Sequence, residues 1–235
     1  MRRINLLILL SILQLLLLVG CGSTNIGGHA IIEWVDFIKW EGIQYEGIRT
    51  GILADKNFIG EKIGEVKFRV ADNVTNPNYK IKDGDAAFLE KGTEIYTIKG
   101  KPDLLALKDK SVIKGYRVYY SRDKNEYQWH FKNVPIEKVN AIEIYQTYTP
   151  NTKKITEIKD RGKLNSFLKI LKNSNESPNF QANSTKGDSA SYEIILYTGE
   201  PIAYKYNMQF DGTTYYWAPW DVSILSNEIG AFLLN

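Results

Sequence analysis

The sequence predicts a mostly β or α+β protein, in which a small antiparallel β barrel or sandwich precedes an α+β domain with an antiparallel sheet and two helices. Short apolar–polar alternations between glycine-containing turns fill the first half, as in antiparallel β domains. Apolar residues spaced i, i+3, i+4 and i+7 at 164–171 indicate an amphipathic helix. Asp211-Gly212, between two strand-like segments, is a strong two-residue hairpin signal.

The first strand-like segment predicts a hairpin. Residues 34–40 and 43–48 favour strands and flank Glu41-Gly42, which is a turn signal. Because side chains alternate between the faces of a strand, we expect one face of this hairpin to be buried. The residues expected on that face are Val35, Phe37, Ile43 and Tyr45.

The rest of the first half predicts further short strands. Residues 64–70 alternate regularly, with Val66, Phe68 and Val70 inward and charged side chains outward. A polar loop interrupted by Asn76-Pro77 follows at 72–82. We expect a single helical turn at 86–89 and strands at 93–98, 104–108 and 115–121.

The second half predicts an antiparallel sheet with two helices. Strands are expected at 127–131, 141–148, 192–198, 202–208 and 213–217. Asp160 is a candidate N-cap for a helix whose apolar stripe is Leu164, Phe167, Leu168 and Leu171. A last helix is expected to open at 219–221, with four side chains inward: Ile224, Leu225, Ile229 and Phe232. We place the domain boundary near 122–140, giving a β domain over 30–125 and an α+β domain over 126–235.

The N-terminus has the organisation of a secretory signal peptide. Met1-Arg2-Arg3 is basic, and residues 4–19 are almost entirely apolar. A membrane-spanning helix needs roughly 20 apolar residues, whereas this run is shorter and is broken by small residues from Gly20 to Ser23. A basic start, a short apolar core and small residues at the cleavage point predict a signal peptide over residues 1–20.

Leu18-Val19-Gly20-Cys21 closes this segment and resembles the lipobox of bacterial lipoproteins. The resemblance implies that the Cys21 thiol receives a diacylglyceryl group and that cleavage makes Cys21 the first residue. Residues 21–29 would then tether the protein to the extracytoplasmic face of the cell membrane, because two acyl chains suffice for stable attachment. The alternatives are a plain signal peptide and an uncut N-terminal anchor helix.

Composition excludes several classes of function. The chain has 30 basic and 27 acidic residues, and loss of Arg2 and Arg3 with the signal peptide leaves it nearly neutral, so we expect no nucleic-acid partner. Cys21 is the only cysteine, which excludes internal disulfides and zinc sites built from cysteine. No cofactor-binding motif occurs, and we predict no cofactor.

A longer part of the chain has a second resemblance. The run EWVDFIKWEGIQYEG at 33–47, followed by residues 63–100, is similar to a segment of uncharacterised lipoproteins from Gram-positive spore-formers. The similarity extends over residues 31–100 and implies a lipoprotein, but no activity and no binding residue. The abundance of Lys, Asn and Ile is typical of an AT-rich Gram-positive bacterium.

The sequence contains no catalytic signature, and we expect no enzyme activity. Gly-x-Ser-x-Gly, Walker and His-Glu-x-x-His motifs are missing, and the two histidines, His29 in the tether and His130 in an aromatic strand, predict no shared site. Asp83-Gly84-Asp85 is interpreted as a turn rather than as a calcium loop. The carboxylate pairs open to a glycan hydrolase are Glu33 with Asp36 and Asp211 with Asp221, although turns and caps also explain them.

Aromatic residues in the second half are the best indication of a binding surface. Aromatic side chains on an exposed sheet face can stack on sugars or anchor a peptide. By strand alternation Tyr204 shares a face with Tyr206, and Tyr215 shares a face with Trp217. The candidate binding face is therefore Tyr204, Tyr206, Tyr215, Trp217 and Trp220, with core packing as the alternative.

We therefore expect a lipid-anchored, extracytoplasmic binding or interaction module, whose partner is an envelope protein or a glycan. One alternative is a cell-wall or glycan hydrolase that uses the carboxylates above. Another is a sensor or accessory subunit of a membrane complex. Two of these carboxylates about 5–10 Å apart in a cleft would favour the hydrolase, whereas burial of Tyr206, Tyr215 and Trp217 would argue against the aromatic face.

Overall fold

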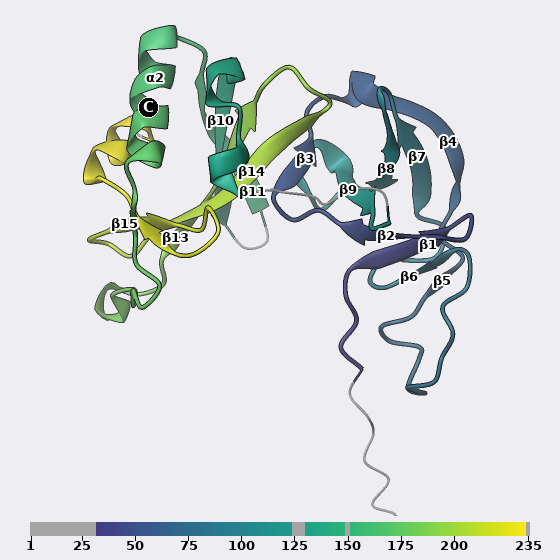
Figure 1. Cartoon of the computed structure of the whole chain (residues 1–235). Coiled ribbons are helices and arrows are strands. Elements are labelled where there is room, and N and C mark those ends of the chain that lie inside the picture. Colours follow the sequence, from purple (N-terminus) through teal and green to yellow (C-terminus); the bar gives the residue numbers. More distant parts are fainter. Residues whose placement is uncertain (1–31, 124–129, 149–150, 234–235) are drawn as a thin grey trace, which may run out of the picture.

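The computed structural model describes residues 32–123, 130–148 and 151–233. These residues form two antiparallel-rich sheets that lie side by side (Figure 1), and their only α-helix packs on the second sheet. The predicted mostly β, α+β class is thereby confirmed. The predicted signal peptide, Cys21 and the tether lie outside the described residues.

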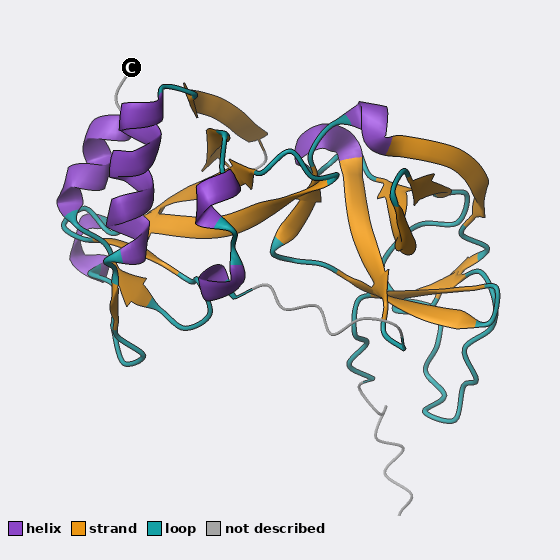
Figure 2. Ribbon diagram, turned by 45° about the horizontal axis from the view of Figure 1, so that its top comes forward, coloured by secondary structure: helices purple, strands orange, loops and turns teal. Residues whose placement is uncertain are grey.

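The first sheet has eight strands in the order β4-β7-β8-β9-β2-β1-β6-β5 and curls into a half-barrel (Figure 2). All neighbours are antiparallel except β5 and β6. Buried apolar side chains such as Ile38, Ile95 and Leu107 fill the inside of the curl. The strands are β1 (Phe37–Trp40), β2 (Ile43–Gly47), β4 (Ile59–Glu65), β5 (Phe68–Arg69), β6 (Asp85–Ala86), β7 (Glu94–Ile98), β8 (Lys101–Lys108) and β9 (Tyr116–Ser121).

The predicted N-terminal hairpin is confirmed, since β1 pairs with β2 and Trp40 lies opposite Ile43. Glu41 and Gly42 both have positive φ, at 50° and 78°, as a tight two-residue hairpin turn requires. Phe37 and Tyr45 are buried as expected, but Val35 precedes β1 and is exposed.

Two local predictions in this half were wrong. The strand expected at 64–70 is divided, because β4 ends at Glu65 and β5 begins at Phe68. Residues 86–89 form no helical turn, since Ala86 pairs with Ile38 of β1 and with Arg69 of β5. In both cases pairing with neighbouring strands, which local sequence does not reveal, decides the conformation.

The second sheet has the order β11-β10-β13-β14-β15-β16-β12, and all its pairs are antiparallel. Three predicted strands, at 141–148, 192–198 and 202–208, correspond to its centre, whereas β11 was not predicted. Its strands are β10 (Ala141–Tyr148), β11 (Asn151–Ile158), β12 (Asn175–Glu176), β13 (Ala190–Tyr197), β14 (Ile202–Phe210), β15 (Tyr215–Trp217) and β16 (Ser223–Ile224).

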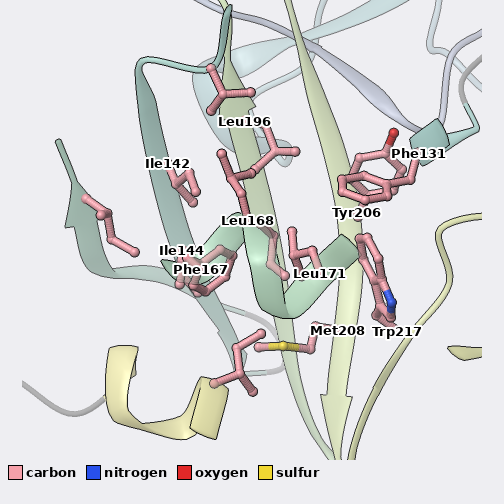
Figure 3. Packing of buried hydrophobic residues seen from close by; sticks show 14 of the residues in the cluster. Phe131, Ile142, Ile144, Phe167, Leu168, Leu171, Leu196, Tyr206, Met208 and Trp217 are labelled. Carbon is pink, nitrogen blue, oxygen red and sulfur yellow. The ribbon is translucent and has the colours of Figure 1, made fainter. Parts of the chain in front are cut away.

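The predicted amphipathic helix is present as α2 (Arg161–Lys172). The Asp160 carboxylate accepts a hydrogen bond from the Lys163 backbone N–H at 2.9 Å, which caps the helix as expected. All four residues of the apolar stripe are buried in the core between the helix and the second sheet, and they are Leu164, Phe167, Leu168 and Leu171. Figure 3 shows Phe167, Leu168 and Leu171 in this core. Among the residues that the structure describes, this layer is the largest apolar cluster.

The last helix was only partly predicted. It is a 3-10 helix, η6 (Asn227–Phe232), and it begins after Ser226, whose hydroxyl accepts from the Glu228 N–H. Leu225 and Ile229 are buried as expected, whereas Ile224 belongs to β16. Residues 127–129 of another predicted strand lie outside the described residues, and Phe131 begins the short 3-10 helix η3 (Phe131–Asn133).

One strand of the first half pairs with the second sheet. β3 (Gly51–Leu53) runs antiparallel to the start of β14, with Leu53 opposite Ile202 and Gly51 opposite Tyr204. Leu53 and Ile202 share an apolar cluster with Ile98, Leu104 and Val118 of the first sheet. The predicted boundary lies between β9 and β10. Strand β3 precedes this boundary in sequence but pairs with a strand that follows it. Over the described ranges, no helix is long and apolar enough to span a bilayer.

Candidate functional site

The structure divides the five aromatic residues of the predicted binding face. Tyr206 and Trp217 are 1% and 2% exposed, and both belong to the core beneath α2 (Figure 3). Tyr204 and Tyr215 are half-buried against the same core, and Tyr215 stacks on Phe210 at a ring separation of 4.2 Å. The predicted exposed face is therefore wrong for Tyr206 and Trp217, because helices cover the strand faces that carry them, and Tyr204 and Tyr215 are only partly accessible. Trp220 is the exception, at 71% exposed.

Trp220 forms a flat platform with His130. The two rings are parallel within 11°, with their centroids 5.7 Å apart. The His130 Nδ1 accepts a hydrogen bond from the Lys132 backbone N–H at 3.0 Å, which fixes the orientation of the imidazole and makes His130 the N-cap of η3. The predicted strand around His130 is thus a capped turn, and its ring supports the exposed indole.

The chain positions this platform through Phe131. The Phe131 backbone N–H donates to the Pro219 carbonyl oxygen at 3.3 Å, which brings the segment after residue 129 beside the segment before Trp220. The Phe131 ring packs edge-on against Trp217 at 4.8 Å and Tyr206 at 5.8 Å. The two buried aromatics therefore anchor the platform from below, and adjacent residues place His130 and Trp220 at the surface.

The platform borders a hollow of about 470 Å³. Its floor is apolar and includes Phe131, Val134, Ile136 and Leu171. Charged side chains of both signs surround this floor, and they are Lys132, Glu137, Lys172, Glu176 and Asp221. An apolar floor, an aromatic wall and a polar rim are features of sites that bind small molecules.

The carboxylates that were paired as candidates for a hydrolase have different surroundings in the structure. The Asp211 carboxylate accepts hydrogen bonds from the backbone N–H groups of Asn183, Thr213 and Thr214, and these bonds hold its pKa well below the ordinary value. Asp211 therefore organises the β14–β15 connection, whereas Asp221 lies at the rim of the hollow. Glu33 is exposed, and Asp36 accepts from the Tyr119 hydroxyl at 2.8 Å.

The Asp83-Gly84-Asp85 segment is a turn, as predicted. Asp85 accepts from the Tyr79 hydroxyl and from the Lys82 N–H, and Asp83 accepts from the Gly42 N–H. Over the ranges that the structure describes, no three His, Cys, Asp or Glu side chains are grouped so that they could hold a metal ion.

Glu143 is a second acid held by several donors, and no sequence motif indicated it. Burial alone would raise its pKa, but hydrogen bonds from Tyr197, Lys114, Tyr145 and Lys154 outweigh burial and hold the pKa at about 2. Burial and the Glu143 charge in turn raise the pKa of Tyr197 and Tyr145. This saturated cluster fastens the β8–β9 connection, which carries Lys114, to the second sheet.

No family model, curated protein or solved structure matches this chain. The assignment of a site therefore rests on geometry. Among the residues predicted from sequence, the structure leaves Trp220 exposed beside a hollow, and it adds His130 and Phe131 as supports. A sequence signal for these supports existed in the aromatic run Trp129-His130-Phe131, but its contact with residues near 220 was not predictable from local pattern.

Proposed function

We propose that this chain is a lipid-anchored protein of the extracytoplasmic face of a bacterial membrane that binds a glycan of the cell envelope without transforming it. The observation that carries the proposal is the exposed Trp220 indole, stacked on His130 at the edge of the hollow. The resemblance of Leu18-Val19-Gly20-Cys21 to a lipobox supports the location.

Sugars fit this arrangement chemically. The flat face of an indole packs against the C–H groups on one side of a sugar ring. Carboxylates and ammonium groups at the rim, such as Glu137, Asp221 and Lys172, can accept from and donate to the ring hydroxyls. Because His130 and Pro219 already fix the platform, binding would order few side chains, which favours affinity.

The glycan proposal is tested with Trp220→Ala in the full chain and cell-wall sacculi as the probe. We expect the variant to bind sacculi at least tenfold more weakly, since losing a central aromatic contact typically costs about 2 kcal/mol or more. Tyr148→Ala removes another exposed aromatic, which is not among the residues lining the hollow, and should bind like the wild type. Equal binding by Trp220→Ala, or no binding by the wild type, would refute the proposal.

The location is tested separately with Cys21→Ala. We expect the unaltered chain to incorporate a fatty-acid probe and to sediment with membranes, because two buried acyl chains suffice for stable attachment. The variant should lose the label. A Cys21→Ala chain that still takes up label and remains in the membrane fraction would contradict lipidation at this residue. If the chain bound a membrane protein and Trp220→Ala still bound it, the accessory-subunit alternative would be favoured instead.

A further inference from the structure

A cleft separates the two sheets and is distinct from the hollow beside Trp220. It has a volume of about 530 Å³, and its lining comes from both halves of the chain. Asp36, Arg49 and Arg117 lie on the side of the first sheet, and Glu193 and Lys205 lie on strands β13 and β14 of the second. Clefts between structural units are preferred positions for ligand sites.

Two of the ion pairs between charged groups of the cleft are long. Arg117 Nη1 is 3.7 Å from Asp36 Oδ2, and Lys205 Nζ is 3.7 Å from Glu193 Oε2. Both distances exceed those of good hydrogen bonds. Within the described part of the chain, Arg49 has no ion pair. Cationic donors and anionic acceptors in the cleft therefore remain available to a ligand.

Other contacts hold these groups at the cleft. Asp109 binds the Arg117 Nε at 2.6 Å and is itself held by the Ser111 N–H and hydroxyl. The Tyr119 hydroxyl fixes Asp36 at 2.8 Å. Gly47 leaves room for that carboxylate, because a Cβ at this position would lie 2.6 Å from Asp36 Oδ2. Such supports preorganise polar groups for binding.

Beyond Glu193 and Lys205, neutral polar side chains follow on the same faces of β13 and β14. Asn207 follows Lys205 on the same strand face and lies opposite Glu193. Its amide nitrogen donates to the Ser191 hydroxyl at 3.0 Å, and its amide oxygen accepts from Gln209 at 3.2 Å. These side chains bond to one another, so the strand faces next to the charged pair are polar and uncharged.

We propose that this cleft binds a zwitterionic ligand, an amino acid or a short peptide with free ends. The ammonium group would be bound by Glu193 and Asp36, and the carboxylate by Arg49 and Arg117. A ligand of one charge would be repelled by two or more of the lining groups. A zwitterion satisfies both sets of charged groups.

The test is calorimetric titration of the full chain with the dipeptide Ala-Ala. We expect binding of Ala-Ala with free ends and none of N-acetyl-Ala-Ala-amide. Arg49→Gln and Glu193→Gln should each weaken Ala-Ala binding by roughly 10–100-fold, as expected for one charge-assisted hydrogen bond. Arg122→Gln, an exposed arginine paired with Glu46 outside the cleft, and Trp220→Ala should bind like the wild type.

Three results would overturn the proposal. The first is no binding of Ala-Ala by the wild-type chain. The second is equal binding of free and blocked dipeptide by the wild type, a comparison that does not depend on how the variants fold. The third is binding of acetate as tight as that of Ala-Ala, which would show that a single negative charge is recognised. Trp220→Ala should bind Ala-Ala like the wild type whether or not it affects binding to sacculi. The titration therefore tests the cleft independently of the glycan proposal.

Discussion

Glu143 is a buried charged residue, with only 8% of its surface exposed to solvent. Such a carboxylate is stable only when donors surround it, and here two tyrosines and two lysines do so. One of them, Lys114, has a φ of 65°, a conformation that is unusual for a residue other than glycine. The surrounding contacts therefore outweigh the local backbone strain at Lys114.

The Glu143 cluster predicts a specific pH dependence of stability. The folded-state pKa of about 2 lies below the ordinary value of 4.5, so the stabilisation is complete above pH 5 and disappears as the pH falls toward 2. Its size is roughly 3 kcal/mol. Glu143→Gln should lower the free energy of unfolding at pH 7 and flatten its decline between pH 5 and pH 2, as measured by urea unfolding.

Glu61→Gln is the matched control for this experiment. Glu61 is exposed on β4, and its carboxylate forms no ion pair within the described chain. The control should leave the acid branch of the stability curve unchanged. An unaltered acid branch in Glu143→Gln would show that other carboxylates cause the decline.

Helix α2 combines a polar start with an apolar face, and both contribute to its stability. Asp160→Ala removes the carboxylate that accepts from the Lys163 N–H, and we expect a loss of about 1 kcal/mol. Asp160→Asn retains a capping oxygen and should lose much less. Urea midpoints at constant slope measure the difference. Equal losses in the two variants would mean that charge, rather than the cap, is what matters.

The elements that could be predicted from the sequence are those whose pattern is formed by residues close together in the chain. The stripe of α2, the Glu41-Gly42 turn and the alternation in β10 depend on nearby residues only. Strand β11, with its exposed Thr, Lys and Glu side chains, has no apolar alternation of its own and forms by pairing with β10. Such edge strands leave a weak pattern in sequence.

The candidate site shows the same limit. Alternation correctly placed Tyr206 with Tyr204, and Trp217 with Tyr215, on shared strand faces. It could not show which face α2 and η6 cover, so an internal layer was interpreted as an exposed one. Trp220 is exposed because it follows Pro219 outside the strands, and its partner His130 comes from a distant part of the chain.

At the scale of the molecule, β3 links the two sheets through its pairing with β14 and through a shared apolar cluster. Leu53 is fully buried where apolar residues of the first sheet meet Ile202 of the second. We expect Leu53→Ala to cost about 2–5 kcal/mol and to lower the stability of both sheets together. Hydrogen exchange at amides of β8 and β13 measures each sheet separately, and both should lose protection by the same amount.

Val35→Ala serves as the control for Leu53→Ala, because Val35 is exposed and lies outside every strand. It should leave the protection of both sheets unchanged. If Leu53→Ala destabilised the first sheet alone, the two halves would unfold independently, as separate domains do.

The position of β3 also has a consequence for the order of folding. β3 precedes β14 in the chain by about 150 residues, so a chain that emerges N-terminus first exposes β3 before its partner strand is present. Until then its backbone amides and carbonyls form an open edge beside the first sheet, available to any other extended chain. The nascent protein therefore depends on a late, long-range closure, and the time before that closure is when it is most exposed to aggregation.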